Sequence, residues 1–497
     1  MRAQTIFFLS MLLFTHFGFL EAASLKNSRP NIIIVMTDDQ GLGDLSCMGN
    51  PVLKTDNLDS FYNQSTRFTD FHVSPSCSPT RAALLSGRHE FRNGVTLTVM
   101  ERERMSLDTT TFPDLLSRNG YQTGIFGKWH LGDEDEYQPY NRGFTEVFIH
   151  GAGGIGQYYD FCSCGDFPPN QDNPYFDNVI LHNDTIVQTK GYCTDVFFHA
   201  ALGWIKKQKA KNTPFFAYIA TNTPHSPRIA PDKYAKRFLD LGYDKNTAGF
   251  YGMVENIDHN FGLMISKLEE WKLMEDTLVI FMTDNGQAPV RPKLNGKSVP
   301  GYNAGFKSGK GSAYEGGTHV PAFWRWDGVL GKGVDIPALT AHIDLFKTFC
   351  ELTGTEITND VQDLDGRSLL PLLENPGAEW KDRYLIVHRG RWGREGEVTT
   401  EEERKYGHHA IRTKRWRFVD NKELYDISND PYESTNVATD YPEVIEELRK
   451  VYDQWWLETV PLMVNEDVPM LSIRPQEVRY NKQLKEKGIP DWIPPEI

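Results

Sequence analysis

Three strongly apolar segments, each followed by polar residues, constrain the fold of this 497-residue chain more than any other feature. The segments are residues 31–36 (NIIIVM), 214–220 (PFFAYIA) and 277–282 (TLVIFM). Short apolar runs rich in β-branched and aromatic residues are typical of strands buried on both faces of a parallel sheet. The polar residues that follow them include Asp38, Asp39, His225, Asp284 and Asn285. Because the carboxyl ends of parallel strands meet at one edge, the sequence predicts an α/β sheet with a site along that edge.

The pattern along the chain predicts two domains and a tail. Helical stretches at residues 111–119 and 251–273 alternate with the apolar runs, so we expect one large α/β domain over residues 24–370. The next region, residues 371–460, predicts a smaller α+β domain with a short antiparallel sheet. Its elements are short strands at 384–388, 409–412 and 416–419 and a helix at 442–456. Residues 461–497 carry prolines and charges without clear periodicity, which indicates a tail that wraps the surface or is partly mobile.

The N-terminus has the pattern of an export signal. Met1 and Arg2 are followed by an apolar run at residues 6–20 and by small residues at 22–24, which predicts a signal peptide over residues 1–23 and a periplasmic or secreted protein. The run is short for a membrane span, which needs about 20 apolar residues, so we expect no stable membrane anchor, with a retained anchor as the alternative. The net charge of −14 and the absence of a Lys/Arg block argue against nucleic-acid binding.

Residues 77–88 (CSPTRAALLSGR) predict a helix that begins at a cysteine. Pro79 suits the first turn of a helix, and the side chain of Ser76 or Ser78 can cap its free amides. Cys77 would then lie beside a helix N-terminus, which favours anions, and Arg81 would lie one turn further on a face that can turn back towards it. The alternative is a capped surface helix with an inert cysteine.

Four oxygen-bearing residues at two strand ends suggest a metal site. Asp38 and Asp39 follow the first run, and Asp284 and Asn285 follow the third. Such hard oxygen ligands suit Ca²⁺ or Mg²⁺ better than zinc, which prefers nitrogen and sulfur. Asp-Asp and Asp-Asn-Gly are also ordinary turn sequences, so each pair alone would indicate only a turn.

These motifs together resemble those of the type I sulfatases, which depend on formylglycine and belong to the alkaline phosphatase superfamily. The Cys-x-Pro-x-Arg core at residues 77–81 is complete, and Ser86 replaces a usual threonine while keeping the hydroxyl. Residues 127–132 (GKWHLG), 222–225 (NTPH) and 307–317 (KSGKGSAYEGG) match further family segments in the family's order. The resemblance implies a sulfuric ester hydrolase with a large, mixed, mostly parallel sheet sandwiched by helices.

The resemblance also implies the cofactors and the roles of individual residues. A maturation enzyme would oxidise Cys77 to formylglycine, whose hydrate attacks sulfur. One Ca²⁺ would be held by modified residue 77 together with Asp38, Asp39, Asp284 and Asn285. The remaining roles are charge neutralisation by Arg81, Lys128 and Lys310, a base at Asp284, a leaving-group acid at His225 and a proton acceptor at His130. Sulfate monoesters are inert anions, so their hydrolysis needs this combination of cations, strong nucleophile and acid.

The substrate is less constrained by the sequence. The chain looks most similar to secreted bacterial enzymes that desulfate carbohydrates, so we expect a sulfated carbohydrate substrate. The glycine-rich residues 150–157 suggest a tight loop near the pocket mouth, with His150 as a candidate substrate contact. The alternatives are a phosphonate monoester or phosphodiester hydrolase of the same superfamily, and a silent binder of sulfated glycans if Cys77 stays unmodified.

The chain has six cysteines. Cys162 and Cys164 are too close in sequence to bridge each other easily, so we expect one of them to pair with Cys193 in an oxidising compartment.

Overall fold

The computed structural model describes residues 24–159, 162–167, 174–390, 392 and 400–497. The predicted signal peptide over residues 1–23 lies outside these residues. Within the described part of the chain, no helix combines the length and apolarity that a membrane crossing requires.

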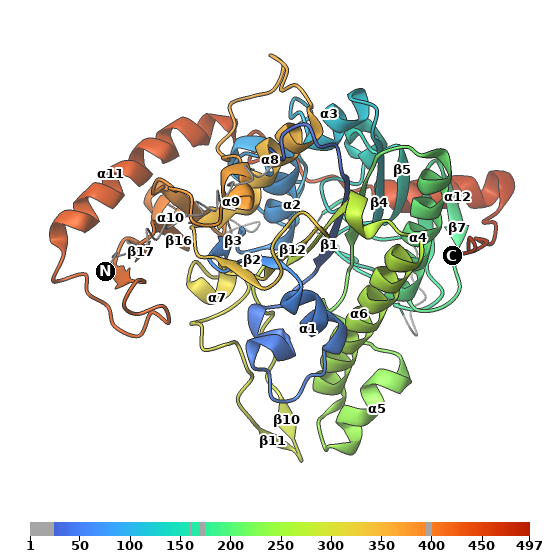
Figure 1. Ribbon diagram of the computed structural model, residues 1–497, viewed down its shortest axis with the longest axis horizontal. Helices are drawn as coiled ribbons and strands as arrows, with labels where there is room; N and C mark the ends of the chain where they lie inside the picture. Colours follow the sequence, from blue (N-terminus) through green and yellow to red (C-terminus); the bar gives the residue numbers. More distant parts are fainter. Residues whose placement is uncertain (1–23, 160–161, 168–173, 391, 393–399) are drawn as a thin grey trace, which may run out of the picture.

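A ten-stranded sheet forms the centre of the molecule (Figure 1). Five neighbouring strands in its middle are mutually parallel, whereas the strands towards both edges include antiparallel neighbours. In spatial order the strands are β13 (Val334–Ile336), β2 (Thr66–Phe68), β12 (Ala322–Arg325), β9 (Thr277–Thr283), β1 (Asn31–Thr37), β8 (Phe215–Ala220), β4 (Gln122–Lys128), β5 (Glu146–His150), β6 (Val179–His182) and β7 (Thr185–Gln188). The three predicted strands are therefore adjacent and parallel, and the predicted mixed, mostly parallel sheet is confirmed.

Successive side chains of β1 pack on opposite faces of the sheet, which explains its continuous apolar sequence. Ile32 and Ile34 belong to a core shared with residues of α2 (Cys77–Ser86), α3 (Phe112–Arg118), α8 (Leu345–Thr353) and α9 (Leu370–Glu374). Ile33 and Val35 belong to the core on the other face, with residues of α1 (Asp56–Asn63), α4 (Cys193–Lys211), α5 (Asp232–Asp240) and α6 (Lys245–Glu270). Helices thus cover both faces of the sheet.

A second, four-stranded antiparallel sheet lies in the C-terminal part of the chain, as predicted. Its strands, in spatial order, are β15 (Leu385–His388), β16 (His409–Arg412), β17 (Trp416–Val419) and β18 (Glu423–Asp426). Helix α11 (Pro442–Thr459) packs on it through Leu448, Tyr452 and Trp456. The remaining strands and α-helices of the described residues before the C-terminal tail are β3 (Phe71–His72), β14 (Thr340–Ala341), β10 (Lys293–Leu294), β11 (Lys297–Ser298), α7 (Glu315–Thr318) and α10 (Glu401–Tyr406).

The C-terminal tail contains a helix that the sequence did not predict. Helix α12 (Pro475–Lys487) lies on the side of the molecule opposite α11 in Figure 1. Its buried residues are Gln476 and Gln483, so it lacks the apolar stripe on which a sequence-based prediction depends. Beyond it the chain runs along β7, where the amide of Trp492 donates to the carbonyl of Gln188 (2.7 Å). The tail therefore wraps the surface.

The predicted pairing of Cys193 is wrong. Cys162 and Cys164 form a disulfide with each other, and Cys193 is a buried free thiol. The two bonded residues are separated by 5.3 Å between Cα atoms, a usual distance for a disulfide, because the chain bends between them. Sequence proximity alone therefore did not exclude this bond.

Candidate active site

The parallel arrangement brings the predicted site residues to one edge of the sheet. Asp38 and Asp39 directly follow β1, and Asp284 and Asn285 directly follow β9, which pairs with β1 from Asn31↔Thr277 to Thr37↔Thr283. Lys128 ends β4 opposite His150 at the end of β5. The structure therefore brings these predicted site residues together at one edge of the sheet.

Cys77 is the first residue of α2, and its side chain is buried. Its sulfur and one carboxylate oxygen each of Asp38 and Asp284 lie within 4.8 Å of one another. Burial raises the pKa of the Cys77 thiol despite the nearby Lys128 and Lys310, so the unmodified thiol is protonated at neutral pH. An ordinary thiolate nucleophile is disfavoured here.

The predicted serine cap of this helix is wrong. Ser76 occupies the N-cap position, but its side chain makes no capping hydrogen bond. Ser78 instead donates its hydroxyl hydrogen to the backbone carbonyl of His130 (2.7 Å) and so joins α2 to the segment after β4. The helix N-terminus beside Cys77 thus has no side-chain cap, and its dipole is free to act on an anion.

Buried ion pairs connect the cations of the site to its acids. Arg81 donates to Asp284 Oδ2 (2.7 Å), and Lys128 Nζ lies 2.6 Å from Asp38 Oδ2, with all four side chains fully buried. Lys310 forms a close ion pair with Asp39. Arg81 turns back towards the site by donating to Asp284. The formal charges of the three cations and the three carboxylates therefore cancel.

The acids have opposite pKa shifts. Burial and the neighbouring Asp38 raise the pKa of Asp284 to about 6, against the opposing effect of Arg81. Burial would also raise the pKa of Asp39, but Lys310 and His225 outweigh it and hold that pKa well below its usual range. Asp39 is therefore ionised, whereas Asp284 can take up or release a proton near neutral pH.

The oxygen cluster fits a hard divalent cation. Asp38 Oδ1 and Asn285 Oδ1 are fully buried and accept no hydrogen bond from the residues that the structure describes. Buried polar atoms normally have partners, so these two oxygens are arranged for an electropositive group. With Asp39 and Asp284 they provide the all-oxygen ligand set that Ca²⁺ and Mg²⁺ prefer.

Two predicted histidines have a nitrogen available for proton transfer. His130 Nε2 donates to the carbonyl of Thr98 (2.8 Å), so Nδ1, which has no partner among the described residues, carries the lone pair. Burial and Lys128 hold the pKa of His130 well below its usual range. His225 Nδ1 donates to the carbonyl of Ser226 (2.7 Å), which leaves Nε2 to face Asp39 Oδ2 at 3.7 Å. Burial lowers the pKa of His225 to about 4.

His150 lies at the same edge. Its Nδ1 donates to the carbonyl of Gly151 (2.7 Å), and its buried Nε2 has no partner in the described part of the chain. Burial and the positive charges of Lys128 and Arg81 lower its pKa to about 3. The imidazole is therefore neutral and can accept a hydrogen bond from a substrate hydroxyl.

Backbone features of the site were not foreseen from the sequence. Asp39 and His130 adopt positive φ angles of 69° and 62°, a conformation that costs most residues about 1 kcal/mol or more. A Cβ at Gly286 would lie 1.8 Å from the carbonyl oxygen of Gly316, so glycine allows the loop after Lys310 to approach β9. The side-chain amide of Asn222 is also buried and unpartnered among the described residues. The close approach of the loop to Gly286 could have been predicted from the Asp-Asn-Gly sequence at residues 284–286.

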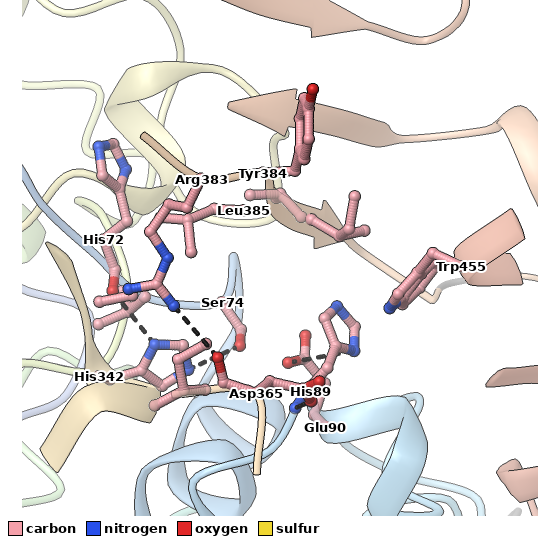
Figure 2. Close-up of a pocket in the computed structure, with 15 residues that line it drawn as sticks. His72, Ser74, His89, Glu90, His342, Asp365, Arg383, Tyr384, Leu385 and Trp455 are labelled. Atoms are coloured by element: carbon pink, nitrogen blue, oxygen red, sulfur yellow. Dashed lines mark hydrogen bonds and ion pairs between the residues drawn. The ribbon is translucent and has the colours of Figure 1, made fainter. Parts of the chain in front are cut away.

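A separate cavity of about 150 Å³ lies at the junction of the main domain and the C-terminal sheet (Figure 2). None of the predicted site residues lines it. Its lining includes Glu90 and His342, which are both buried. Burial raises the pKa of Glu90 to about 8 and lowers that of His342 to about 3. These two side chains of the cavity are therefore uncharged, whereas the side chains around Cys77 are charged.

The fold and the charged site together define a class of protein. An α/β enzyme with a helix N-terminus, two buried cations, a third that is partly buried and a cluster of oxygen ligands is suited to act on an anionic group.

Comparisons with known proteins identify the family. The sulfatase family model matches residues 30–355, and a model described as N-sulphoglucosamine sulphohydrolase, C-terminal, matches residues 308–455. The chain is 34% identical to N-acetylgalactosamine-6-sulfatase of Canis lupus familiaris, over 73% of this chain and 69% of that protein. It is 31% identical to human arylsulfatase A, over 86% of this chain and 88% of that protein. The chain belongs to the sulfatase family and is a sulfuric ester hydrolase.

Solved structures agree with this assignment. The crystal structure titled Ps i-CgsB in complex with k-i-k-neocarrahexaose is similar with a TM-score of 0.74 and 27% identity, and the match covers 92% of this chain and 98% of that one. The family that the sequence motifs predicted is thereby confirmed.

Proposed function

We propose that this sulfatase hydrolyses sulfate monoesters on a carbohydrate, with formylglycine made from Cys77 as the nucleophile and one bound calcium ion. The observation that carries the proposal is the convergence of Cys77, the buried oxygen cluster and three cations at one sheet edge. The substrate class is supported by relatives whose names or titles refer to N-acetylgalactosamine and to a neocarrahexaose.

The residues at the edge would hold the two groups. Asp38, Asp39, Asp284 and Asn285 would hold the calcium ion. Carboxylate oxygens of Asp38 lie within 4.8 Å of oxygens of Asp39 and of Asp284, and Asp38 Oδ1 and Asn285 Oδ1 lack partners among the described residues. When bound, the ion withdraws charge from sulfate oxygens, and the hydrated aldehyde at residue 77 supplies a hydroxyl nucleophile. The high pKa of the unmodified Cys77 thiol supports a need for this modification.

The cations would bind and orient the sulfate group. Lys128 and Lys310 lie close enough to residue 77 to influence its charge, and Arg81 is fixed by Asp284 on the same side. Asp284, whose carboxylate lies beside residue 77, is placed to accept the proton of the attacking hydroxyl. These groups are already ordered by their ion pairs, so they need little reorganisation when the ester binds.

The two histidines would move protons at separate positions. His225 Nε2 would donate to the leaving oxygen, since an anionic sulfate beside it favours the charged form and raises its pKa. His130 Nδ1, which carries the free lone pair, would accept the proton that is released when sulfate departs. His150 is proposed as a contact to the carbohydrate.

Export and maturation form part of the proposal. The Cys162–Cys164 disulfide supports an oxidising compartment, in agreement with a signal peptide over residues 1–23. Cys77 is only 3% exposed, so the maturation enzyme would act before the chain is fully folded. N-terminal sequencing of the exported protein tests the cleavage site.

The proposal is tested by measuring sulfate release from sulfated mono- and oligosaccharides and from an aryl sulfate. The protein is coexpressed with a formylglycine-generating enzyme, and the residue 77 peptide is checked by mass spectrometry. We expect chelator-sensitive release from at least one sugar. Fully modified protein that instead cleaves phosphonate monoesters or phosphodiesters, or that only binds sulfated glycans, contradicts it.

A further inference from the structure

Two arginines of the C-terminal sheet lie directly opposite each other. Arg412 on β16 pairs with Arg417 on β17 in the strand register, and their exposed fractions are 2% and 0%. Like charges facing each other across neighbouring strands are unfavourable, and burial increases that cost. An anion from outside the sheet must therefore compensate them.

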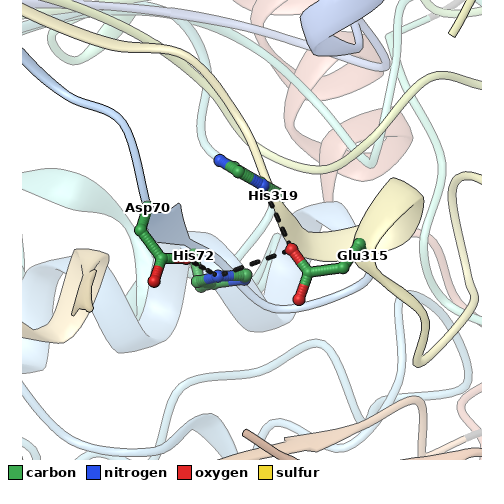
Figure 3. A group of neighbouring side chains, drawn as sticks. All are labelled: Asp70, His72, Glu315 and His319. Carbon is green, nitrogen blue, oxygen red and sulfur yellow. Dashed lines mark hydrogen bonds and ion pairs between the residues drawn. The ribbon is translucent and has the colours of Figure 1, made fainter. Parts of the chain in front are cut away.

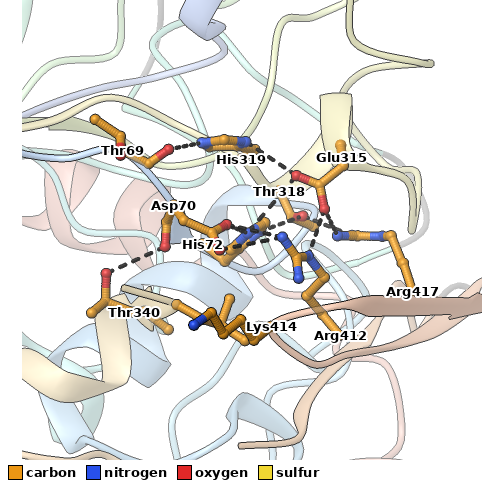
Figure 4. A network of polar contacts seen from close by, with 12 residues as sticks. Thr69, Asp70, His72, Glu315, Thr318, His319, Thr340, Arg412, Lys414 and Arg417 are labelled. Atoms are coloured by element: carbon orange, nitrogen blue, oxygen red, sulfur yellow. Dashed lines mark hydrogen bonds and ion pairs between the residues drawn. The ribbon is translucent and has the colours of Figure 1, made fainter. Parts of the chain in front are cut away.

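Asp70 pairs with Arg412 and Glu433 with Arg417, and Glu315, the first residue of α7, is the anion that both arginines share (Figure 4). Its Oε1 accepts a hydrogen bond from Arg412 Nε (2.8 Å) and another from Arg417 Nη1 (2.7 Å). Burial would raise the pKa of Glu315, but the two arginines outweigh it and hold the pKa well below its usual range. Arg417 also donates from Nε to the carbonyl of Ala313 (2.7 Å) and from Nη2 to Thr318 Oγ1 (2.8 Å). One buried guanidinium therefore fixes three points of the segment over residues 313–318.

This segment continues directly from Lys310. The backbone amide of Lys310 donates to the carbonyl of Gln287 (2.9 Å), two residues after Asn285. The amide of Gly311 donates to the carbonyl of Pro75 (2.7 Å), two residues before Cys77. Lys310 Nζ pairs with Asp39. The loop is thus held against the active site on one side and against the C-terminal sheet on the other.

A metal site is the competing interpretation of the same region. Single ligand atoms of Asp70, His72, Glu315 and His319 lie within 4.8 Å of one another (Figure 3). The acids are already neutralised, however, because Arg412 donates to Asp70 (3.1 Å) as well as to Glu315.

His319 also acts as a donor at both ring nitrogens. Its Nε2 faces the carbonyl of Thr69 at 2.9 Å and its Nδ1 faces Glu315 Oε2 at 3.1 Å, and both of these oxygens can only accept. An imidazolium satisfies this geometry without a metal, since both of its nitrogens donate.

We propose that Arg412 and Arg417 are positioning residues for Lys310, acting through Glu315 and the backbone of residues 313–318. The C-terminal sheet would then set the place of a sulfate-binding lysine without touching the substrate. The inference rests on the proposed function, because it takes Lys310 to act on the ester.

A double-mutant cycle tests the proposal. Arg417→Lys keeps the charge but cannot make the three guanidinium contacts, so we expect kcat to fall about 10- to 100-fold with little change in KM. In a Lys310→Ala background the same substitution should lower kcat less than about 2-fold, since the residue it positions is already gone. The unfolding midpoint should fall equally in both backgrounds. Arg415→Lys is the matched control, because Arg415 is an exposed arginine in the turn between β16 and β17 that pairs with Asp426, and its kcat should stay unchanged.

The outcomes separate the two hypotheses. Wild-type protein without sulfatase activity contradicts the proposed function, and the cycle is then run on whichever ester the protein cleaves. An equal loss of kcat in both backgrounds overturns the positioning role, as does stoichiometric zinc in the purified protein that disappears in His319→Gln. If Arg417→Lys does not fold, Thr318→Val removes the Oγ1 contacts to Arg417 Nη2 and to His72 Nδ1 and should show the same coupling to Lys310 at a smaller magnitude.

Discussion

Calcium should stabilise this protein, and Asn285 should be necessary for that effect. The site holds three carboxylates against three cations, so a divalent ion adds net positive charge that an anionic ester can then balance. Before it binds, Asp38 Oδ1 and Asn285 Oδ1 are buried without partners among the described residues, at a cost of about 1–3 kcal/mol each. Calcium at 100 times its dissociation constant would stabilise the folded state by about 2.7 kcal/mol. We expect the unfolding midpoint to rise by a few degrees relative to chelator.

Asn285→Ala removes one ligand without changing the charge of the site. If calcium affinity falls about 100-fold, the same calcium concentration stabilises the variant by only about 0.4 kcal/mol, and the midpoint shift nearly disappears. Asn256→Ala is the matched control, because it removes a buried amide that donates to Asp195 instead (2.7 Å). It should lower the midpoint in both buffers and keep the calcium shift. Thermal unfolding in calcium, magnesium and chelator measures these effects.

Two results would refute this reasoning. A wild-type midpoint that is the same with calcium, magnesium and chelator would show that the oxygen cluster binds no such ion. A full calcium shift in Asn285→Ala would show that the stabilising ion lies elsewhere.

Three further predictions concern single residues. Cys77→Ser should fold with an unchanged circular dichroism spectrum yet release no sulfate over repeated turnovers, and normal activity would rule out the formylglycine mechanism. His225→Ala should lose about 10²- to 10⁴-fold in kcat with a sugar sulfate but much less with a nitrophenyl sulfate, whose leaving group needs no acid; equal losses would argue against its role as acid. Burial raises the pKa of Glu90 from 4.5 to about 8, so its stabilising contribution is complete below pH 4.5 and is lost as the pH rises through 8. Glu90→Gln should therefore gain stability relative to wild type between pH 5 and pH 8 in thermal unfolding, and a constant difference would contradict the shift.

Local sequence patterns predicted the parts of the fold that depend on local physics. The observed bounds of β1, β8 and β9 differ from the predicted runs by at most one residue at either end, because a strand buried on both faces needs a continuous apolar sequence. Helix α6 begins at Lys245, six residues before the predicted start, since Asp244 caps it through the amides of Asn246 and Thr247. Helix α12 escaped prediction because polar glutamines form its buried face.

The site residues were predictable for a related reason. Strand ends place Asp38, Asp39, Asp284 and Asn285 together once the sheet is known to be parallel, so the order of the strands did not need to be known in detail. The protonation states were not predictable in this way. The raised pKa of Asp284 and the low pKa of His130 depend on burial and on neighbours that come from other elements.

The contribution of the C-terminal sheet required long-range geometry. In the sequence, Arg412 and Arg417 are ordinary strand residues separated by a turn. Only the register of β16 and β17 places them opposite each other, and only the docking of that sheet brings both to Glu315. Because breaking a buried ion pair typically costs about 3–5 kcal/mol, the contact also ties the stability of the domain junction to the placement of the Lys310 loop. Through the loop over residues 310–318, which contacts both, a sheet that lies outside the catalytic edge can therefore influence catalysis.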